Sequence, residues 1–125
     1  MTALLADTHA LLWWLADDAR LSDHACAVIE AGERTVHFSA ASVWEAEIKA
    51  AVGKLVVPDD LVDALEADGF LELGITARHA REAARLPPLH RDPFDRMIAA
   101  QARLEDFTVI TRDPKIAAYG APVLW

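Results

Sequence analysis

The sequence predicts an α/β fold in which a central parallel sheet is covered by helices on both faces. Short apolar runs alternate with helical patterns along the 125-residue chain. This alternation is typical of parallel strands joined by right-handed helical crossovers. Apolar residue types make up 54% of the chain, enough for one well-buried core, so we expect one domain over residues 1–125.

Five segments of the chain have the composition of strands. The first is a short apolar run that ends at Asp7, and the next three contain β-branched or aromatic residues. A fifth segment, at the end of the chain, could add a short edge strand. The expected strands are residues 3–6, 35–38, 70–73, 107–110 and 123–125.

The segments between the strands have helical patterns, and most carry a recognisable start or stop. Thr76 is placed to cap one of them, and Gly32 is placed to end another. Asp92-Pro93 and Asp113-Pro114 repeat one pattern, an acidic N-cap followed by proline at the first helical position. The expected helices are residues 8–16, 22–31, 39–55, 59–68, 76–86 and the two segments that begin at these Asp-Pro pairs.

The first expected helix contains five consecutive apolar residues, Leu-Leu-Trp-Trp-Leu, at positions 11–15. Such a run covers the whole circumference of a helix, and one intramolecular contact cannot bury it. We expect an exposed apolar patch at Trp13 and Trp14 that another chain covers, with complete burial in the core as the alternative. A charged residue at either position would then disrupt association and leave the monomer folded.

The helix expected over residues 39–55 places its large apolar residues on one side. Its predicted buried face consists of Trp44, Ile48, Ala51, Val52 and Leu55. Glu45 lies at the edge of this face. Local interactions could explain Glu45, because Ser42 and Glu45 have capping-box spacing and Glu45 and Lys49 form an i,i+4 pair worth only about 0.2–0.5 kcal/mol. We expect Ser39 and Ser42 to act as caps.

The charge of the chain argues against a general nucleic-acid coat protein. The net charge is −8, whereas nonspecific binding to nucleic acid requires a basic surface. The charge is unevenly distributed, because residues 78–103 carry six arginines and three acids. Arg78, Arg81 and Arg85 in this segment have the spacing of the solvated side of one helix.

The beginning of the sequence and its cysteine usage suggest a compartment. Cys26 is the single cysteine, so an internal disulfide is excluded, which suits a reducing environment. The first residues have no basic region before the apolar run, which is too short to span a bilayer. We therefore expect a cytosolic protein that does not enter the membrane.

Four acidic residues occupy equivalent places in the predicted fold. Asp7 and Asp113 directly follow strands, and Glu45 and Asp95 lie in the first turns of helices. Right-handed crossovers bring strand ends and helix starts to one edge of the sheet, where open α/β folds carry their sites. Each acid alone has a bland explanation, since Asp113 is a suitable N-cap and Asp95 is favoured by the helix dipole. Together they predict a cluster of four carboxylates.

Such a cluster requires a positive partner. Like charges within a few Å raise one another's pKa and cost several kcal/mol unless they are neutralised. Ligation by carboxylate oxygens and water is how proteins hold Mg²⁺ or Mn²⁺. A bound ion of this kind polarises phosphate oxygens and activates water for phosphodiester cleavage. The cluster therefore predicts a metal-dependent site that acts on nucleic acid.

Other chemistries have less support in the sequence. The five histidines include no i,i+4 pair and no cysteine companion, so a zinc site is not expected. No GxxxxGK[ST], GxGxxG or GxSxG motif is present. His9 and His90 flank candidate acids and could contact phosphate or be ordinary surface residues. Thr111 could support a metal ligand.

Four segments in the same order resemble a known family. They are LLADTHALLW, SAASVWEAEIKAAVGKL, LHRDPFDRMIAAQA and VITRDP. Together they resemble the PIN-domain ribonucleases, and most closely the VapC-like toxins of bacterial type II toxin–antitoxin pairs. The resemblance implies a three-layer α/β/α sandwich with a central parallel sheet, RNA cleavage that depends on Mg²⁺ or Mn²⁺, a homodimer, and inhibition by a cognate antitoxin.

The resemblance also implies roles for individual residues. The four family acids fall on Asp7, Glu45, Asp95 and Asp113. Many relatives have Asn at the fourth position and a further acid three residues on, where this chain has Ile116. Asp92 is extra to the four-acid pattern, and we expect it to be a helix N-cap first and an outer-shell ligand second.

The sequence thus predicts an endoribonuclease toxin in which Arg96 or Arg112 helps to hold RNA. One alternative is a structure-specific DNA nuclease on the same scaffold. Another is a receiver-like Mg²⁺-binding module, although Ala6 precedes Asp7 where paired acids are expected and an arginine follows Thr111 where a lysine is expected. A third is a catalytically silent binding partner.

Overall fold

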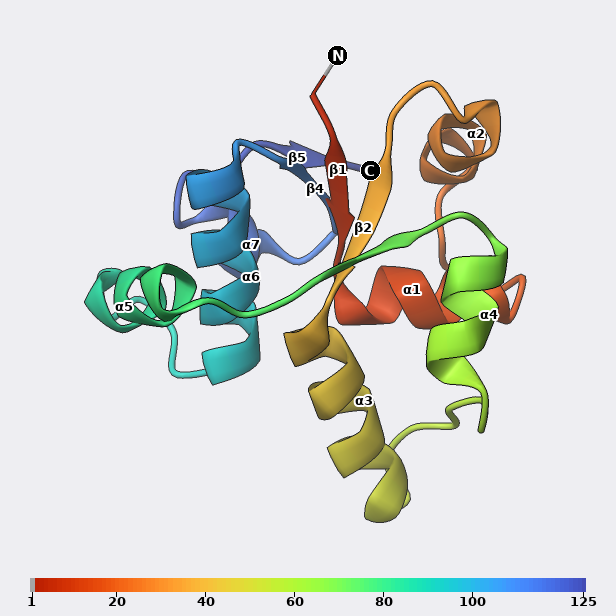
Figure 1. Cartoon of the computed structure of the whole chain (residues 1–125), viewed down its shortest axis with the longest axis horizontal. Helices are drawn as coiled ribbons and strands as arrows, with labels where there is room; N and C mark the ends of the chain where they lie inside the picture. The colour runs from red at the N-terminus through yellow and green to blue at the C-terminus, as the bar shows by residue number, and fades with distance from the viewer. Residues whose placement is uncertain (1) are drawn as a thin grey trace.

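A five-stranded, all-parallel sheet forms the centre of the computed structural model, which describes residues 2–125 (Figure 1). The strands are β1 (Leu4–Ala6), β2 (Val36–Ser39), β3 (Leu71–Leu73), β4 (Thr108–Ile110) and β5 (Val123–Leu124). Their order across the sheet is β3-β2-β1-β4-β5. The predicted α/β fold is confirmed, and the segment at the end of the chain does add an edge strand.

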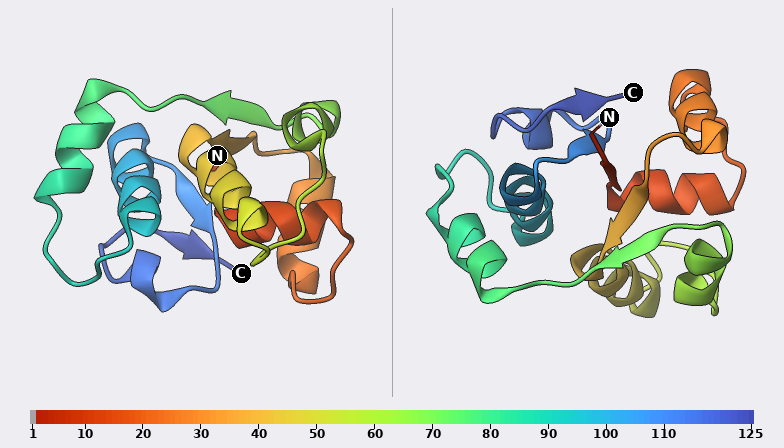
Figure 2. Two further views of the ribbon diagram at one scale, coloured as in Figure 1. Left: turned by 90° about the horizontal axis from the view of Figure 1, so that it is seen from below. Right: turned by 45° about the horizontal axis from the view of Figure 1, so that its top comes forward.

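Seven helices cover the sheet and its carboxyl edge. They are α1 (Thr8–Leu15), α2 (Asp23–Ala31), α3 (Ala40–Ala51), α4 (Leu61–Ala67), α5 (Ala77–Arg85), α6 (Pro93–Glu105) and α7 (Pro114–Ala117) among the described residues. Helices α1, α2 and α4 lie on one side of the sheet and α5, α6 and α7 on the other, whereas α3 continues beyond the end of β2 (Figures 1 and 2).

Strand β1 is buried on both faces and separates two apolar clusters. Leu4 and Ala6 belong to the cluster under α1, α2 and α4, and Leu5 belongs to the cluster under α5, α6 and α7. All three residues are almost fully buried. A strand buried on both faces explains why residues 4–6 form a continuous apolar run.

Most of the predicted helix ends are confirmed. Gly32 ends α2 with a φ of 67°, as predicted. The structure adds that Ser22 caps the start of α2, since its side chain accepts a hydrogen bond from the Ala25 amide. Thr76 caps α5, on which Arg78 and Arg81 are exposed, in agreement with a solvated face.

The structure contains no helix, within residues 2–125, that is long and apolar enough to cross a bilayer.

The predicted cap of α3 is partly wrong. Ser39 caps this helix, because its side chain accepts a hydrogen bond from the Ala41 amide at 3.0 Å. Ser42 lies one turn further on, and its hydroxyl oxygen is buried without a hydrogen-bond partner in residues 2–125. Ser42 and Glu45 therefore do not form a capping box, and Glu45 is free to make tertiary contacts.

The predicted buried face of α3 is also wrong. Trp44, Ile48 and Val52 are 62%, 42% and 65% exposed. The residues that α3 buries are Ala41, Ser42, Glu45 and Ala46. The helical wheel identified the apolar stripe, but α3 turns its narrow, small-residue face toward α1 and α6, and the Trp44 ring meets only the edge of Phe94 at 5.3 Å.

The predicted exposed patch on α1 is wrong, and burial is the outcome. Trp13 is 9% exposed, and its ring packs edge-on against Trp125 at 6.0 Å. Trp14 is half-buried against Phe70, and its indole N–H donates to an Asp68 carboxylate oxygen at 2.9 Å. Helix α1 is enclosed from several directions, so a whole apolar circumference is accommodated within one chain.

The contrast between Trp13 and Trp44 gives a test of the fold. Trp13→Ala should lower the free energy of unfolding by about 3–5 kcal/mol because it removes a buried ring and leaves a cavity. Trp44→Ala should change it by less than about 1 kcal/mol because that ring is largely exposed. Urea denaturation followed by circular dichroism measures both values, and equal losses would contradict this assignment of buried and exposed faces.

Candidate metal centre

Asp7 lies at the carboxyl end of β1 and begins α1. Its carboxylate accepts a hydrogen bond from the Ala10 amide at 2.8 Å, so Asp7 is the N-cap of that helix. Burial raises the pKa of Asp7, while hydrogen bonds from the Thr111 side chain and the Ala10 amide act in the opposite direction. The nearby Asp113 carboxylate raises this pKa further. Asp7 is therefore a half-buried acid with a second acid beside it.

Asp113 occupies the corresponding place after β4. Its carboxylate accepts from the Lys115 amide at 2.9 Å, which confirms that Asp113 is an N-cap. The Thr111 hydroxyl oxygen accepts a hydrogen bond from the Asp113 amide at 2.9 Å. Thr111 thus contacts the Asp7 side chain and the Asp113 backbone.

Asp95 projects from the first turn of α6, and Asp92 caps that helix. The Asp92 carboxylate accepts from the amides of Phe94 and Asp95, which confirms its capping role. Burial, and then the negative charges of Asp92, Asp113 and Glu45, raise the pKa of Asp95 to about 7. This shift shows that the acids of α3, α6 and the β4–α7 connection lie within electrostatic reach of one another.

Glu45 is buried on the inner face of α3, and both of its carboxylate oxygens have partners. Oε1 accepts a hydrogen bond from the Thr8 hydroxyl at 2.6 Å, and Oε2 accepts one from the Lys49 ammonium at 2.5 Å. The side chain is only 6% exposed. Thr8 therefore connects α1 to α3 through a residue that the motif match assigns to the metal site.

These residues fit a hard divalent cation by chemistry. The donors are carboxylate oxygens, which are the ligands that Mg²⁺ and Mn²⁺ prefer, and their mutual repulsion is what a cation relieves. Within residues 2–125, however, no group of three or more His, Cys, Asp or Glu side chains is arranged to hold a metal ion. Glu45 is turned toward Thr8 and Lys49. Ligation by all four acids therefore stays a prediction that requires side-chain movement.

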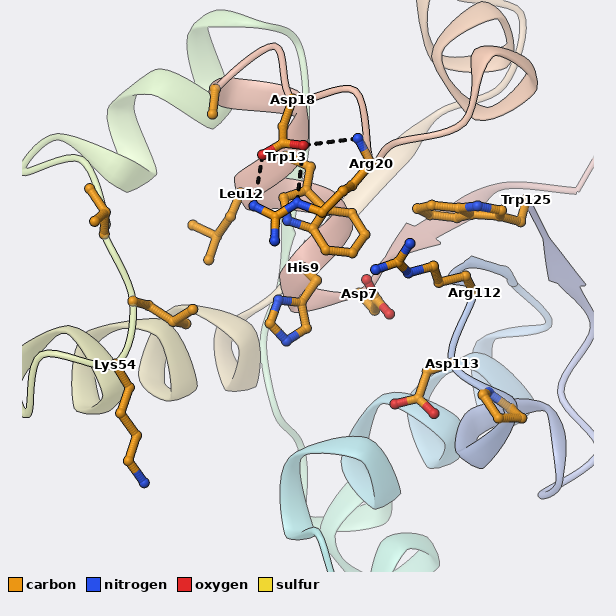
Figure 3. Close-up of a pocket in the computed structure, with 14 residues that line it drawn as sticks. Asp7, His9, Leu12, Trp13, Asp18, Arg20, Lys54, Arg112, Asp113 and Trp125 are labelled. Atoms are coloured by element: carbon orange, nitrogen blue, oxygen red, sulfur yellow. Dashed lines mark hydrogen bonds and ion pairs between the residues drawn. The ribbon is translucent and has the colours of Figure 1, made fainter.

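A cavity of about 790 Å³ adjoins Asp7 and Asp113. Figure 3 shows both acids at one end of it, together with Arg112, and Lys54 on the opposite side. The Arg112 guanidinium lies 4.5 Å from the centre of the Trp13 ring. The cavity therefore combines carboxylates with exposed cations, which suits a phosphate-containing chain next to a metal.

Arg96, the other arginine considered for RNA binding, is not among the residues that line this cavity. Its guanidinium donates to the backbone carbonyls of Ala83 and Leu86 at 2.8 and 2.9 Å and to that of Pro87 at 3.0 Å. It also donates to the Tyr119 hydroxyl at 3.3 Å. These bonds use its donors to tie the end of α5 to α6, so we assign Arg96 a structural role.

The two histidines that flank acids have different surroundings. His9 is exposed and lines the cavity, with its ring 5.5 Å from that of Trp13. The His90 amide donates to the Tyr119 hydroxyl at 3.0 Å, and its ring packs edge-on against Tyr119. The structure therefore places His9 at the cavity and His90 in the connection before α6.

No sequence pattern predicted the positions of several residues that line the cavity or contact the site. Thr8 carries a weak signal, because a hydroxyl directly follows the first acid, but nothing in the sequence pairs it with Glu45. Arg20 and Trp125 also line the cavity. They are distant from the acidic motifs, and only the fold brings them together.

Comparison with known proteins identifies the family. The PIN domain model matches residues 4–122 of the chain. The chain belongs to the PIN domain family. Ribonuclease VapC22 of Mycobacterium tuberculosis is 30% identical to this PIN domain over 125 residues, covering 98% of the chain and 95% of that protein.

Solved structures support the fold of this PIN domain. A toxin–antitoxin complex from Klebsiella pneumoniae contains a chain with a TM-score of 0.69 and 21% identity, covering 98% of this chain and 97% of the other. VapC20 of M. tuberculosis, described as a sarcin–ricin loop cleaving toxin, has a TM-score of 0.67 and 17% identity, covering 95% and 96% of the two chains. At these identities the likeness establishes the fold.

The raised pKa of Asp95 predicts how stability depends on pH. Folding raises this pKa from 3.8 to about 7, so the folded chain binds more protons than the unfolded chain between these values. The contribution of Asp95 is therefore most favourable at low pH and is lost as pH rises through about 7. In EDTA, the stability of the wild type relative to Asp95→Asn should fall between pH 5 and pH 8.

Urea denaturation at the two pH values measures this difference. Asp63→Asn is the control, because Asp63 is exposed in the first turn of α4. The control should follow the wild type at both pH values. If the free energies of unfolding of the wild type and Asp95→Asn change in parallel with pH, folding does not raise the pKa of Asp95.

Proposed function

We propose that this PIN domain, over residues 1–125, is a Mg²⁺-dependent endoribonuclease toxin inhibited by a cognate antitoxin. The observation that carries the proposal is the approach of Asp7, Asp95, Asp113 and Glu45 at the carboxyl edge of the sheet, beside a cavity lined by cations. The ribonuclease activity named for VapC22 and the toxin–antitoxin complex from K. pneumoniae support it.

In the proposed reaction, different residues of the chain bind the metal, orient its ligands and bind RNA. Asp7, Asp95, Asp113 and Glu45 would hold Mg²⁺, with Mn²⁺ as a substitute. When bound, the ion supplies Lewis acidity toward a phosphate oxygen and lowers the pKa of a bound water. Thr111 orients Asp7 and the β4–α7 connection. Arg112 and His9, at the same cavity, bind the RNA backbone and keep the scissile phosphate next to the acids.

Two partners follow from the proposal. The antitoxin would cover the cavity or compete with RNA for its cations, and the toxin would act as a homodimer. The antitoxin rests on the family resemblance and on the toxin–antitoxin complex from K. pneumoniae. The homodimer rests on the family resemblance alone. The receiver-like alternative is disfavoured because Arg112, an arginine, follows Thr111 and Asp7 has no paired acid before it.

Loss of one site carboxylate should abolish RNA cleavage without unfolding the chain. We expect Asp7→Asn and Asp95→Asn to lower kcat at least about 100-fold, because each removes a charged oxygen ligand. Cleavage of single-stranded RNA in Mg²⁺, with and without EDTA, measures the effect. Asp63→Asn should cleave like the wild type. Full activity of either site variant, or activity in EDTA, would contradict the mechanism.

The same assay separates the rival functions. The wild type should cleave RNA in preference to single-stranded DNA, and the reverse preference would support a DNA nuclease. Expression of the wild type alone should arrest growth, whereas Asp7→Asn or co-expression with the adjacent reading frame should relieve the arrest. Normal growth together with no cleavage of either nucleic acid would support a silent binding protein.

Arg112 should contribute to substrate binding more than to chemistry. Arg112→Gln should raise the KM for RNA about tenfold with a small change in kcat, because it removes a charge-assisted contact to phosphate. Arg103→Gln is the matched control, since Arg103 is exposed on α6 and pairs loosely with Glu82 at 3.7 Å. Steady-state kinetics at two salt concentrations measures both variants, and equal effects would exclude a specific role for Arg112.

A further inference from the structure

Lys49 is the one lysine whose ammonium contacts a carboxylate of the candidate metal centre among the residues that the structure describes. It lies one turn after Glu45 on α3 and binds Glu45 Oε2 at 2.5 Å. Its side chain is 33% exposed, whereas that of Glu45 is 6% exposed. The contact is therefore a partly buried ion pair, which water screens less than a surface pair.

Lys49 also faces the acids of the neighbouring helix. The hydrogen bond that Lys49 donates to Glu45 raises the pKa of Lys49, as do the negative charges of Glu45, Asp92 and Asp95. Three carboxylates on two helices thus share the charge of one ammonium group. The ammonium therefore partly offsets the repulsion between Glu45 on α3 and the acids at the start of α6.

The hydrogen bonds of Glu45 make this cation relevant to metal binding. Oε1 accepts a hydrogen bond from the Thr8 hydroxyl, and Oε2 accepts one from the Lys49 ammonium. A divalent ion that approaches Oε2 would meet the ammonium within a few Å, and two cations on one carboxylate oxygen repel each other. Direct ligation by Glu45 therefore requires that Lys49 move away from it.

We propose that Lys49 is a positioning residue, an internal counterion that holds Glu45 and is displaced from it when a divalent cation binds. This inference rests on the metal-dependent function proposed above. Lys49 holds the Glu45 carboxylate in place, but it also competes with the ion for Glu45. The consequence is that the wild type binds metal more weakly than its carboxylates alone would.

Removal of Lys49 should tighten metal binding. We expect Lys49→Met to raise the affinity for Mn²⁺ about three- to tenfold, because it removes a competitor for Glu45. Arg103→Met is the matched control, since it removes the same charge from an exposed side chain that pairs with Glu82 at 3.7 Å and not with a site carboxylate. The control should change the affinity by less than about twofold. Isothermal titration calorimetry with Mn²⁺ alone measures binding without any nuclease assay.

A second measurement uses the wild type and does not depend on the folding of a variant. The chain contains three lysines, Lys49, Lys54 and Lys115, so selective ¹³C labelling of lysine side chains gives three assignable sets of signals. Titration with Mg²⁺ should shift the Lys49 signals strongly as its contact with Glu45 breaks. The Lys54 signals should move least.

The outcomes separate this inference from the proposed function. If the wild type binds no Mn²⁺ or Mg²⁺, the metal-dependent function itself is overturned. If the wild type binds metal but Lys49→Met binds it equally or more weakly, the competitive role of Lys49 is overturned and the metal site remains. Unmoved Lys49 signals during a saturating Mg²⁺ titration would overturn the displacement in the same way.

Discussion

Several carboxylates lie at one edge of the parallel sheet, and the contacts around them depend on the electrostatic repulsion among these groups. The parallel order places Asp7 and Asp113 after adjacent strands, and the crossover helices bring Glu45 and Asp95 to the same edge. The chain offsets the repulsion locally, through backbone amides, hydroxyls and one ammonium. Burial raises the pKa values of Asp7 and Asp95 first, and the neighbouring carboxylates raise them further. A divalent cation held by these oxygens, as proposed above, would relieve the repulsion among them.

The features that depend on neighbours in sequence could be predicted. Alternation of strand and helix patterns predicted the parallel sheet, and Asp-Pro pairs predicted the starts of α6 and α7. The proximity of Asp7 and Asp113 followed from topology, because both come directly after strands. The partners of Glu45 could not be predicted in full. Its i,i+4 contact with Lys49 is local, but its bond to Thr8 depends on how α1 and α3 pack.

The failed predictions share one physical cause. A helical wheel shows where apolar residues lie on a helix but not which side the rest of the chain covers. For α1 the covering is more complete than expected, because Phe70 and Trp125 arrive from distant segments. For α3 it is less complete, and the stripe that contains Trp44 remains exposed because Glu45 and Ala46 face inward instead. Arg96 illustrates the same dependence, since its carbonyl partners are defined by the path of the chain after α5.

Three acids at this edge of the sheet cap helices and also contribute negative charge, and substitution can separate these two effects. Asp7, Asp92 and Asp113 each accept a hydrogen bond from a backbone amide at the start of a helix. Asparagine keeps an acceptor oxygen and caps helices about as well as aspartate, whereas alanine loses the cap at a cost of about 1 kcal/mol. An Asp→Asn change at these positions therefore removes charge while it preserves the helix start. Because the repulsion also decreases, the folded chain should tolerate this change well, so a loss of function would reflect the charge itself.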